Sequence, residues 1–204
     1  MFYWLLKYIF MGPFIRLFWI KRIDGLENIP REGPIILAPN HSSYLDFFSL
    51  ATICPRRIHF VAAEVFFNSK LWLPLMVLTR QTKIDRKSKD KSETLRQINK
   101  ILKSGKVFCI FPEGTRSRTG KIQKSYSGVF RIAKENKVDI VPVAINGAYE
   151  VLPPNKKIPK LRKKIQICFL EKMEYKYFDQ KDNEDSLGFL MTKIANKIGQ
   201  RYKW

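Results

Sequence analysis

Residues 34–46 read PIILAPNHSSYLD. The apolar run Pro34–Ala38 has the composition of a buried β-strand, which ends at Ala38-Pro39. Residues Asn40 to Ser43 then form a polar turn that leads into a helix. Such strand-to-helix turns favour catalytic groups, because the scaffold holds the side chains while the chain reaches the surface. This stretch therefore predicts a buried strand and, directly after it, a place for chemistry.

Similar apolar runs recur along the chain and predict four further strands. These runs are Ile58–Ala62, Lys106–Phe111, Asp139–Ile145 and Lys164–Leu170. Apolar residues at helical spacing over Leu95–Leu102 and Leu187–Ile198 predict helices between and after them. The alternation indicates an α/β fold, and 204 residues suit one domain. We therefore expect residues 22–204 to form a single domain with a central mixed sheet flanked by helices. The basic, proline-containing stretch Pro153–Lys164 predicts an exposed loop.

An apolar, aromatic segment, FYWLLKYIFMGPFIRLFWI, covers Phe2–Ile20. Lys7 and Arg16 interrupt this segment, and Gly12-Pro13 falls in its middle, so a single membrane-spanning helix is a poor interpretation. Two helices of about ten residues would each be ~15 Å long, roughly half the thickness of the bilayer hydrocarbon. We therefore expect residues 1–21 to form a helical hairpin that binds the membrane interface. Two helices packed on the core of the domain are the alternative.

Positive charge is the unusual feature of the composition, because the formal net charge is +20 at pH 7. This charge indicates a negatively charged partner, which nucleic acid, an anionic membrane surface or a phosphorylated substrate would each satisfy. The chain has only two histidines, and its three cysteines, Cys54, Cys109 and Cys168, lie far apart without metal-ligand spacing. We therefore expect reduced cysteines and no metal site.

His41 and Asp46 are the first residues that suggest a reaction. On one continuous helix, residues five apart would point about 140° apart and could not meet. If His41 precedes the helix and Asp46 lies in its first turn, the carboxylate reaches the imidazole and leaves the other ring nitrogen free to accept a proton. The alternative is structural, because Ser43-Tyr44-Leu45-Asp46 is also a capping-box pattern.

A second polar stretch, FPEGTRSRTG at residues 111–120, follows another predicted strand. Pro112 ends that strand, since proline cannot continue the interior of a sheet. Gly114 permits close approach of the backbone to a ligand, and Arg116 and Arg118 offer planar donors that match phosphate oxygens. The pattern favours a phosphate-binding loop, with a solvated basic turn as the alternative.

These two stretches together resemble the lysophosphatidic acid acyltransferase family, the bacterial glycerolipid acyltransferases. NHSSYLD, residues 40–46, is similar to the first block of the family, and FPEGTRS, residues 111–117, is similar to the third. VPVAING, residues 141–147, resembles the apolar fourth block. The resemblance extends over roughly residues 33–151, and the order of the blocks is that of the family.

The second block of the family is represented less closely. Residues 80–86 read RQTKIDR, in which Arg86 matches the family pattern. Arg80 stands where the family usually has glycine, and Lys83 stands where it has an apolar residue. This departure concerns recognition of the acceptor and leaves the catalytic pair unaffected.

The resemblance implies transfer of a fatty acyl group from a thioester donor to the sn-2 hydroxyl of 1-acyl-glycerol 3-phosphate, which forms phosphatidic acid in phospholipid biosynthesis. His41 would act as the general base and Asp46 would orient it. The acceptor hydroxyl would attack the thioester directly, so no acyl-enzyme is needed. By the same resemblance, the acceptor-binding residues would be Arg86, Glu113, Gly114, Thr115 and Arg116.

The reaction needs no bound cofactor, because acyl-CoA or an acyl carrier protein thioester serves as co-substrate. Backbone amides near Gly114 or in the His41 turn are candidate oxyanion donors. We expect the protein to be a monotopic or peripheral protein of the cell membrane, with the catalytic domain on the cytoplasmic side and an anionic membrane surface as its partner.

Other acceptors stay open, namely glycerol 3-phosphate and lysophospholipids with another headgroup. A hypothesis of a different class is a basic nucleic-acid-binding domain. Its charge would be right, but the aromatic residues cluster in the apolar N-terminus rather than alternating with Lys and Arg. The sequence also has no helix-turn-helix, zinc or RNA-recognition signature. We therefore expect a lipid-modifying enzyme that does not bind nucleic acid.

Overall fold

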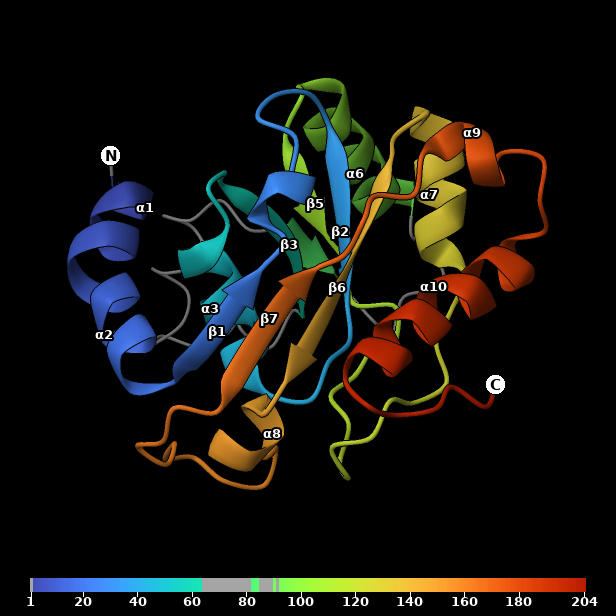
Figure 1. The fold of residues 1–204 in the computed structure, drawn as a ribbon. Coiled ribbons are helices and arrows are strands. Elements are labelled where there is room, and N and C mark those ends of the chain that lie inside the picture. Colours follow the sequence, from blue (N-terminus) through green and yellow to red (C-terminus); the bar gives the residue numbers. More distant parts are fainter. Residues whose placement is uncertain (1, 64–81, 85–89, 91) are drawn as a thin grey trace.

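The computed structural model describes residues 2–63, 82–84, 90 and 92–204 of the chain. Within these ranges, one seven-stranded sheet has the order β1-β7-β6-β2-β5-β3-β4 (Figure 1). The strands are β1 (Ile20–Asp24), β2 (Ile35–Pro39), β3 (Ile58–Ala63), β4 (Thr82–Ile84), β5 (Val107–Cys109), β6 (Ile140–Asn146) and β7 (Ile165–Phe169). Neighbouring strands run parallel except β6 and β7, which are antiparallel. The predicted mixed central sheet is therefore confirmed.

Helices cover both faces of this sheet, as Figure 1 shows. The α-helices are α1 (Phe2–Leu5), α2 (Met11–Phe18), α3 (Tyr44–Ile53), α6 (Ser92–Lys103), α7 (Gly128–Asn136), α8 (Ala148–Val151), α9 (Tyr175–Phe178) and α10 (Asn183–Lys197). A π-helical turn, η1 (Leu6–Phe10), joins α1 to α2, and a 3₁₀ turn, η2 (Leu26–Asn28), follows β1. Helices α2 and α3 pack on one face, whereas α6, α7 and α10 pack on the other.

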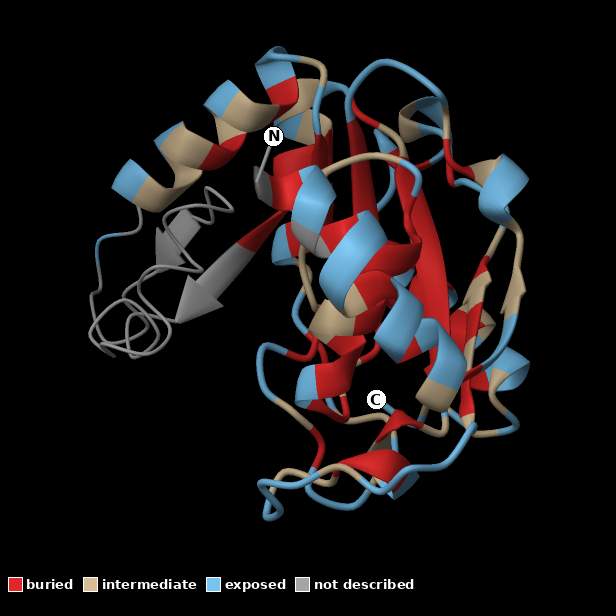
Figure 2. Cartoon of the chain, turned by 90° about the vertical axis from the view of Figure 1, so that its left-hand side faces the viewer, coloured by how far each residue is buried: buried red, intermediate tan, exposed pale blue. Residues whose placement is uncertain are grey.

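The central strand β2 explains why two cores form. All five of its residues are buried, because β5 and β6 flank it and helices cover both faces. Ile35 and Leu37 point into the core on the α3 side, while Ile36 and Ala38 point into the core beneath α6, α7 and α10. A parallel strand buried on both faces is apolar at every position, as the sequence indicated. Figure 2 shows this burial concentrated in the sheet and on the inner faces of the helices.

All five strands predicted from apolar runs are present, with ends within two residues of the prediction. The predicted helices correspond to α6 and α10. The sequence did not predict β1 or β4. Strand β1 lies at the edge of the sheet and pairs only with β7, so its exposed Lys21 and Arg22 hide the apolar pattern that identifies a buried strand.

The expected hairpin at the N-terminus is not the arrangement found. Helices α1, η1 and α2 follow one another without a reversal, as one N-terminal helical segment, Phe2–Phe18 (Figure 1). The irregularity is the π turn Leu6–Phe10 rather than a break at Gly12-Pro13. Pro13 lies in the first turn of α2, where the lack of an N–H leaves few hydrogen bonds unmade. Ile20 and Lys21, expected to end the membrane segment, begin β1 instead.

One face of the N-terminal helical segment is fixed to the domain. The hydroxyl of Tyr3 donates to the carbonyl of Ala51 at 3.1 Å, and burial raises the pKa of that hydroxyl to about 12. The ammonium group of Lys7 is buried and donates to the carbonyl of Cys54, the residue that caps the C-terminus of α3. A cation is favourable there, because carbonyl groups without helical partners concentrate negative charge at that end.

The opposite face of the N-terminal helical segment is apolar and exposed. The exposed large apolar residues there are Trp4, Leu5, Tyr8, Ile9, Phe10, Phe14 and Leu17. Among the residues that the structure describes, no helix has both the length and the apolar character needed to cross a bilayer. The segment is therefore amphipathic, with its polar anchor Lys7 directed inward and much of its aromatic surface directed outward.

We predict that Gly12→Ala destabilises the protein by ~1–3 kcal/mol, the usual range for overpacking. The π turn brings the carbonyl of Lys7 against Gly12, so an added methyl group would overlap the Lys7 oxygen. Gly188→Ala is the matched control, since a methyl group in the middle of α10 meets nothing within 4 Å and improves helix propensity by roughly 1 kcal/mol. Chemical unfolding of both variants measures the difference, and equal stabilities would contradict the π-turn packing.

Candidate active site

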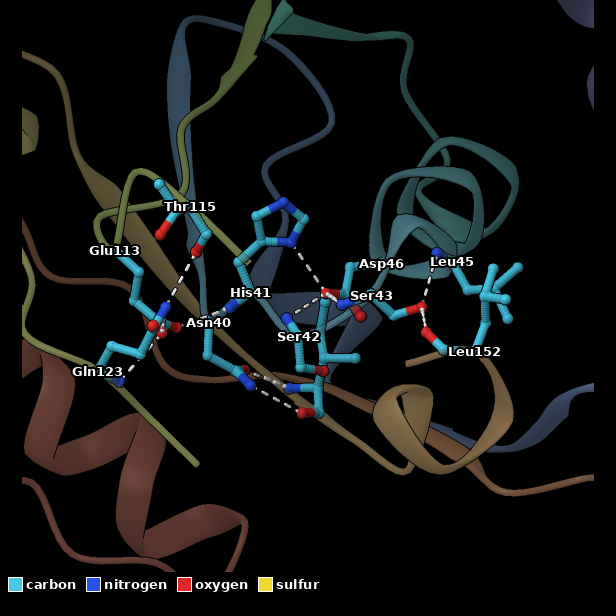
Figure 3. Close-up of polar contacts among 11 residues, drawn as sticks. Asn40, His41, Ser42, Ser43, Leu45, Asp46, Glu113, Thr115, Gln123 and Leu152 are labelled. Atoms are coloured by element: carbon cyan, nitrogen blue, oxygen red, sulfur yellow. Dashed lines mark hydrogen bonds and ion pairs between the residues drawn. The ribbon is translucent and has the colours of Figure 1, made fainter. Parts of the chain in front are cut away.

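The turn after β2 is fixed by an asparagine that acts as an extra strand residue. Pro39 ends β2 opposite Val143. The buried side chain of Asn40 then donates to the carbonyl of Ile145 at 2.9 Å and accepts from its N–H at 2.8 Å. These two bonds extend the connection between β2 and β6 by one residue and determine where His41 leaves the sheet (Figure 3).

His41 and Asp46 meet as the sequence predicted. Nδ1 of His41 lies 3.0 Å from Oδ2 of Asp46, which is fully buried, while 15% of the His41 side chain is exposed. The same Oδ2 accepts the backbone N–H groups of Ser42 at 2.7 Å and Ser43 at 2.8 Å. Ser43 caps α3, and the capping box with Asp46 is present. The carboxylate of Asp46 therefore has both of the roles that the sequence suggested. It caps α3, and it orients the imidazole of His41 so that Nε2 points away from the carboxylate (Figure 3).

The loop after β5 forms hydrogen bonds with both the backbone N–H and the backbone carbonyl of His41. The N–H of His41 donates to Oε1 of Glu113 at 2.7 Å, and the N–H of Ser117 donates to the carbonyl of His41 at 2.8 Å. The imidazole also stacks on the ring of Phe111, with a centroid separation of 4.0 Å and an interplanar angle of 23°. The two sequence blocks therefore build a single site around one residue.

The side chain of Glu113 is directed into the protein, where it contacts other residues, and not toward the solvent. Its side chain is buried, and its second oxygen, Oε2, accepts from the backbone N–H of Gln123 at 3.0 Å and from the side-chain amide of Gln123 at 3.2 Å. Burial raises the pKa of Glu113 from 4.5 to about 7; the bonds from His41 and Gln123 lower it, and the charge of Asp46 raises it further. The contacts of Glu113 thus position His41, whereas the family resemblance implied contact with the acceptor.

The same loop continues with Gly114 and Thr115, which are exposed, and Arg116, which is half-buried. Gly114 has φ +69°, a left-handed conformation that glycine adopts without strain. The carbonyl of Thr115 accepts from the side-chain amide of Gln123 at 3.1 Å. The guanidinium of Arg116 lies 3.5 Å from the ring centroid of Tyr44, the first residue of α3. This cation–π contact holds the arginine beside the turn that carries His41.

Four of the backbone amides that are candidate oxyanion donors already donate hydrogen bonds within the protein. The N–H of His41 binds Glu113, and those of Ser42 and Ser43 bind Asp46. The N–H of Gly114 donates to the carbonyl of Phe111 at 3.0 Å. These four groups hold the turns together. Arg86, the remaining candidate for acceptor binding, lies outside the described residues.

Sequence reasoning missed four residues that shape the site: Asn40, Tyr44, Phe111 and Gln123. The partners of Asn40 lie 105 residues away, and Gln123 meets Glu113 across a ten-residue loop. Neither pairing has a periodic or motif signal within the chain. The position of Asn40, between a strand-ending proline and a candidate catalytic histidine, was the one local indication.

A small cavity of about 240 Å³ lies beyond Ser42, between the loop Thr119–Lys121 and the end of β6. Ligand pockets for drug-sized molecules usually measure roughly 300–1,000 Å³, so this cavity is small for a lysolipid. Within the described part of the chain, no three His, Cys, Asp or Glu side chains gather closely enough to hold a metal ion. Cys54, Cys109 and Cys168 are free thiols.

We predict that Glu113→Gln removes a pH dependence from the stability of the protein. A carboxyl group whose pKa is 4.5 unfolded and about 7 folded binds more protons in the native state between these values, so wild-type stability falls as pH rises through this window. The loss amounts to about 3 kcal/mol. Urea unfolding over the pH range should show the variant gaining stability relative to wild type by that amount. Parallel curves for the two proteins would contradict a raised pKa at Glu113.

The chain matches the family model described as Acyltransferase over residues 21–146. It is 29% identical over 140 residues to a chloroplastic 1-acyl-sn-glycerol-3-phosphate acyltransferase of Arabidopsis thaliana, covering 67% of this chain and 38% of that protein. With the 1-acyl-sn-glycerol-3-phosphate acyltransferase of Bacillus subtilis the identity is 31% over 127 residues, which cover 62% of each chain. A probable enzyme of the same name from Mycoplasma pneumoniae is 27% identical, covering 85% of this chain and 69% of that protein.

The fold has a solved counterpart in the 1-acyl-sn-glycerophosphate (LPA) acyltransferase of Thermotoga maritima. The TM-score is 0.78, with 24% sequence identity, over 94% of this chain and 77% of that one. This chain spans about two fifths of the length of the plant and algal relatives. The family model nevertheless covers more than half of the chain and includes both stretches that form the site. The chain therefore belongs to the acyltransferase family that its sequence blocks resemble.

Proposed function

We propose that this protein is an O-acyltransferase that moves a fatty acyl group from a thioester to the sn-2 hydroxyl of 1-acyl-glycerol 3-phosphate, forming phosphatidic acid for phospholipid biosynthesis. The observation that carries this proposal is the 3.0 Å contact between His41 and Asp46, in a chain of the acyltransferase family. The relatives that are named as 1-acyl-sn-glycerol-3-phosphate acyltransferases support the choice of acceptor. Acyl-CoA and acyl carrier protein thioesters are both suitable donors.

In the proposed reaction, Nε2 of His41 takes the proton from the acceptor hydroxyl as its oxygen attacks the thioester carbonyl. Asp46 holds Nδ1–H and stabilises the imidazolium ion that results. The new C–O bond forms, the C–S bond breaks, and the imidazolium returns its proton to the departing sulfur. General acid–base catalysis of this kind contributes ~10²–10⁴ in rate.

The acceptor phosphate is proposed to bind Arg116, with Arg86 as a second ligand suggested by the family resemblance. A guanidinium group offers two parallel donors to phosphate oxygens. Stacking on Tyr44 limits the number of orientations that Arg116 samples, so less conformational entropy is lost when the phosphate binds. Its place beside the His41 turn suits an acceptor whose hydroxyl must reach Nε2.

We further propose that the N-terminal helical segment lies in the membrane interface. Its exposed apolar face would enter the boundary between headgroups and acyl chains, and the domain would stay on the cytoplasmic side. The proposed anionic partner is thus lipid rather than nucleic acid, which accounts for the formal charge of +20 together with the apolar face. Monotopic attachment of this kind would let the acceptor enter the site from the leaflet.

His41→Ala should lower the turnover number for lysophosphatidate by at least ~10²-fold, because the reaction loses its base. Asp46→Asn should also lose most activity, since a neutral amide cannot stabilise the imidazolium ion. The amide oxygen still accepts the N–H groups of Ser42 and Ser43, so stability should change by only about 1 kcal/mol. Acyl transfer with both donors, on lysophosphatidate and glycerol 3-phosphate, measures these losses. Normal turnover by Asp46→Asn would reduce Asp46 to a helix cap.

Arg116→Ala should lower kcat/KM for lysophosphatidate by about 10–100-fold, which corresponds to one charged hydrogen-bonded contact of ~1.5–3 kcal/mol. Transfer to monoacylglycerol, which has no phosphate, should change much less. Arg116→Lys keeps the charge without the planar geometry and should fall between wild type and Arg116→Ala. Equal losses on both acceptors would assign Arg116 to the fold or to the acyl donor.

A further inference from the structure

A second surface of the protein combines charge with exposed apolar side chains. The segment Pro153–Lys164, here called the basic loop, contains six Lys or Arg residues and no acidic residue. It connects α8 to β7, and its prediction as an exposed loop is confirmed. Two apolar residues, Ile158 and Leu161, lie within it and are 83% and 70% exposed. No other large apolar side chain is as exposed among the residues that the structure describes.

The basic loop is attached to the end of the N-terminal helical segment. The indole N–H of Trp19, one residue after α2, donates to the carbonyl of Lys160 at 2.9 Å. The N–H groups of Lys164 and Ile165 donate to the carbonyl of Trp19 at 3.1 and 2.9 Å. Within the loop, the N–H of Lys160 donates to the carbonyl of Val151 at 2.9 Å. The basic loop is therefore held against the end of α2, at the lower left of Figure 1.

The basic loop also lies at the catalytic edge of the sheet. Strands β2, β5 and β6 are parallel, so the turns that follow them share one edge. Strand β7 is antiparallel to β6, and the loop that leads into it therefore starts at this same edge. The hydroxyl of Ser43 donates to the carbonyl of Leu152 at 2.7 Å, which ties the His41 turn to the residue before the loop (Figure 3).

We propose that the basic loop is a second membrane-docking element, which inserts Ile158 and Leu161 into an anionic phospholipid bilayer beside the N-terminal helical segment. This inference rests on the proposed function, because it concerns how the site reaches an acceptor that resides in the leaflet. The ammonium of Lys164 lies 3.5 Å from the carboxylate of Glu150, and among the residues that the structure describes the other five basic side chains of the loop form no ion pair with a carboxylate. Apolar tips flanked by cations suit the boundary between charged headgroups and acyl chains.

An acidic carrier protein would also be attracted by the charge of the basic loop. The two exposed apolar tips, and the hydrogen bonds that hold the basic loop against the end of the N-terminal helical segment, favour a bilayer instead. A flat lipid surface can contact the basic loop and the N-terminal helical segment at the same time, whereas attraction by charge alone does not require contact with both. Docking of an acidic acyl carrier protein on the basic loop would therefore overturn the proposal.

The test is titration of the full-length protein with vesicles made of equal parts phosphatidylcholine and phosphatidylglycerol, followed by flotation. The apolar variant, Ile158→Ser with Leu161→Ser, should bind about a hundredfold more weakly, because each of the two buried aliphatic side chains contributes about tenfold. The charge variant replaces Lys156, Lys157, Arg162 and Lys163 with Gln. It should bind about six hundredfold more weakly and lose most of the salt dependence, since each of the four cations contributes about fivefold.

A matched control removes the same charge elsewhere. It replaces Lys100, Lys103, Arg131 and Lys176 with Gln, all exposed on α6, α7 and α9. The control should retain most of the vesicle affinity of the wild type. Phe10→Ser with Phe14→Ser, in the N-terminal helical segment, serves as the reference for loss of a docking element. Thermal unfolding should be unchanged in the loop variants, because the replaced side chains are exposed.

Wild-type affinity in both loop variants would overturn the proposal, as would an equal loss in the matched control. Normal vesicle binding with slower transfer from acyl carrier protein alone would also overturn it and assign the basic loop to the donor. Failure of the wild type to acylate any lysophosphatidate would remove the proposed function, while the vesicle titrations would still decide whether the loop docks. Weaker binding by both loop variants, with normal transfer to a short-chain soluble lysophosphatidate, is the supporting result.

Discussion

The hydrogen bond from the backbone of His41 to the buried carboxylate of Glu113 joins two parts of the chain that lie 72 residues apart. The N–H of Ser117 donates to the carbonyl of His41, and Asp46 orients the imidazole ring. His41, the proposed catalytic base, is thereby held at its backbone N–H, its backbone carbonyl and one ring nitrogen, which leaves Nε2 for a substrate. A general base must keep its position within a fraction of an ångström to work, and buried charged hydrogen bonds supply that rigidity.

Two carboxylates buried close together carry an electrostatic cost, which is visible at Glu113. Burial is the main cause of its raised pKa, and the charge of Asp46 adds to it, although the N–H groups of His41 and Gln123 oppose both. Gln123 completes the arrangement by donating twice to Glu113 and once to Thr115, so the loop after β5 keeps its shape while Arg116 stays at the surface. The motif Glu113-Gly114-Thr115-Arg116 thus divides its work: the acid faces inward and the arginine faces the solvent and Tyr44.

The direction of the strands places the His41 turn, the end of the N-terminal helical segment and the basic loop at one edge of the sheet. Strands β2 and β6 end there, while β1 and β7 begin there, because β7 runs antiparallel to β6. Lys7 is the clearest example of a residue whose structural role depends on the fold. In the sequence it interrupts an apolar segment and argues against a spanning helix; in the fold it is the buried anchor that binds the end of α3 and turns the aromatic side chains outward.

The sequence by itself determined the α/β class, five of the strands, the contact between His41 and Asp46 and the family. These features depend on local information: strands buried on both faces are apolar throughout, and a capping box places its carboxylate by backbone geometry alone. Tertiary structure decided the rest. The edge strand β1 exists because β7 pairs with it, and the N-terminal helical segment continues through Gly12 and Pro13 without a reversal, with a π turn before them. Glu113 faces inward because His41 and Gln123 meet it there. Such outcomes depend on partners distant in the chain, which no local pattern specifies.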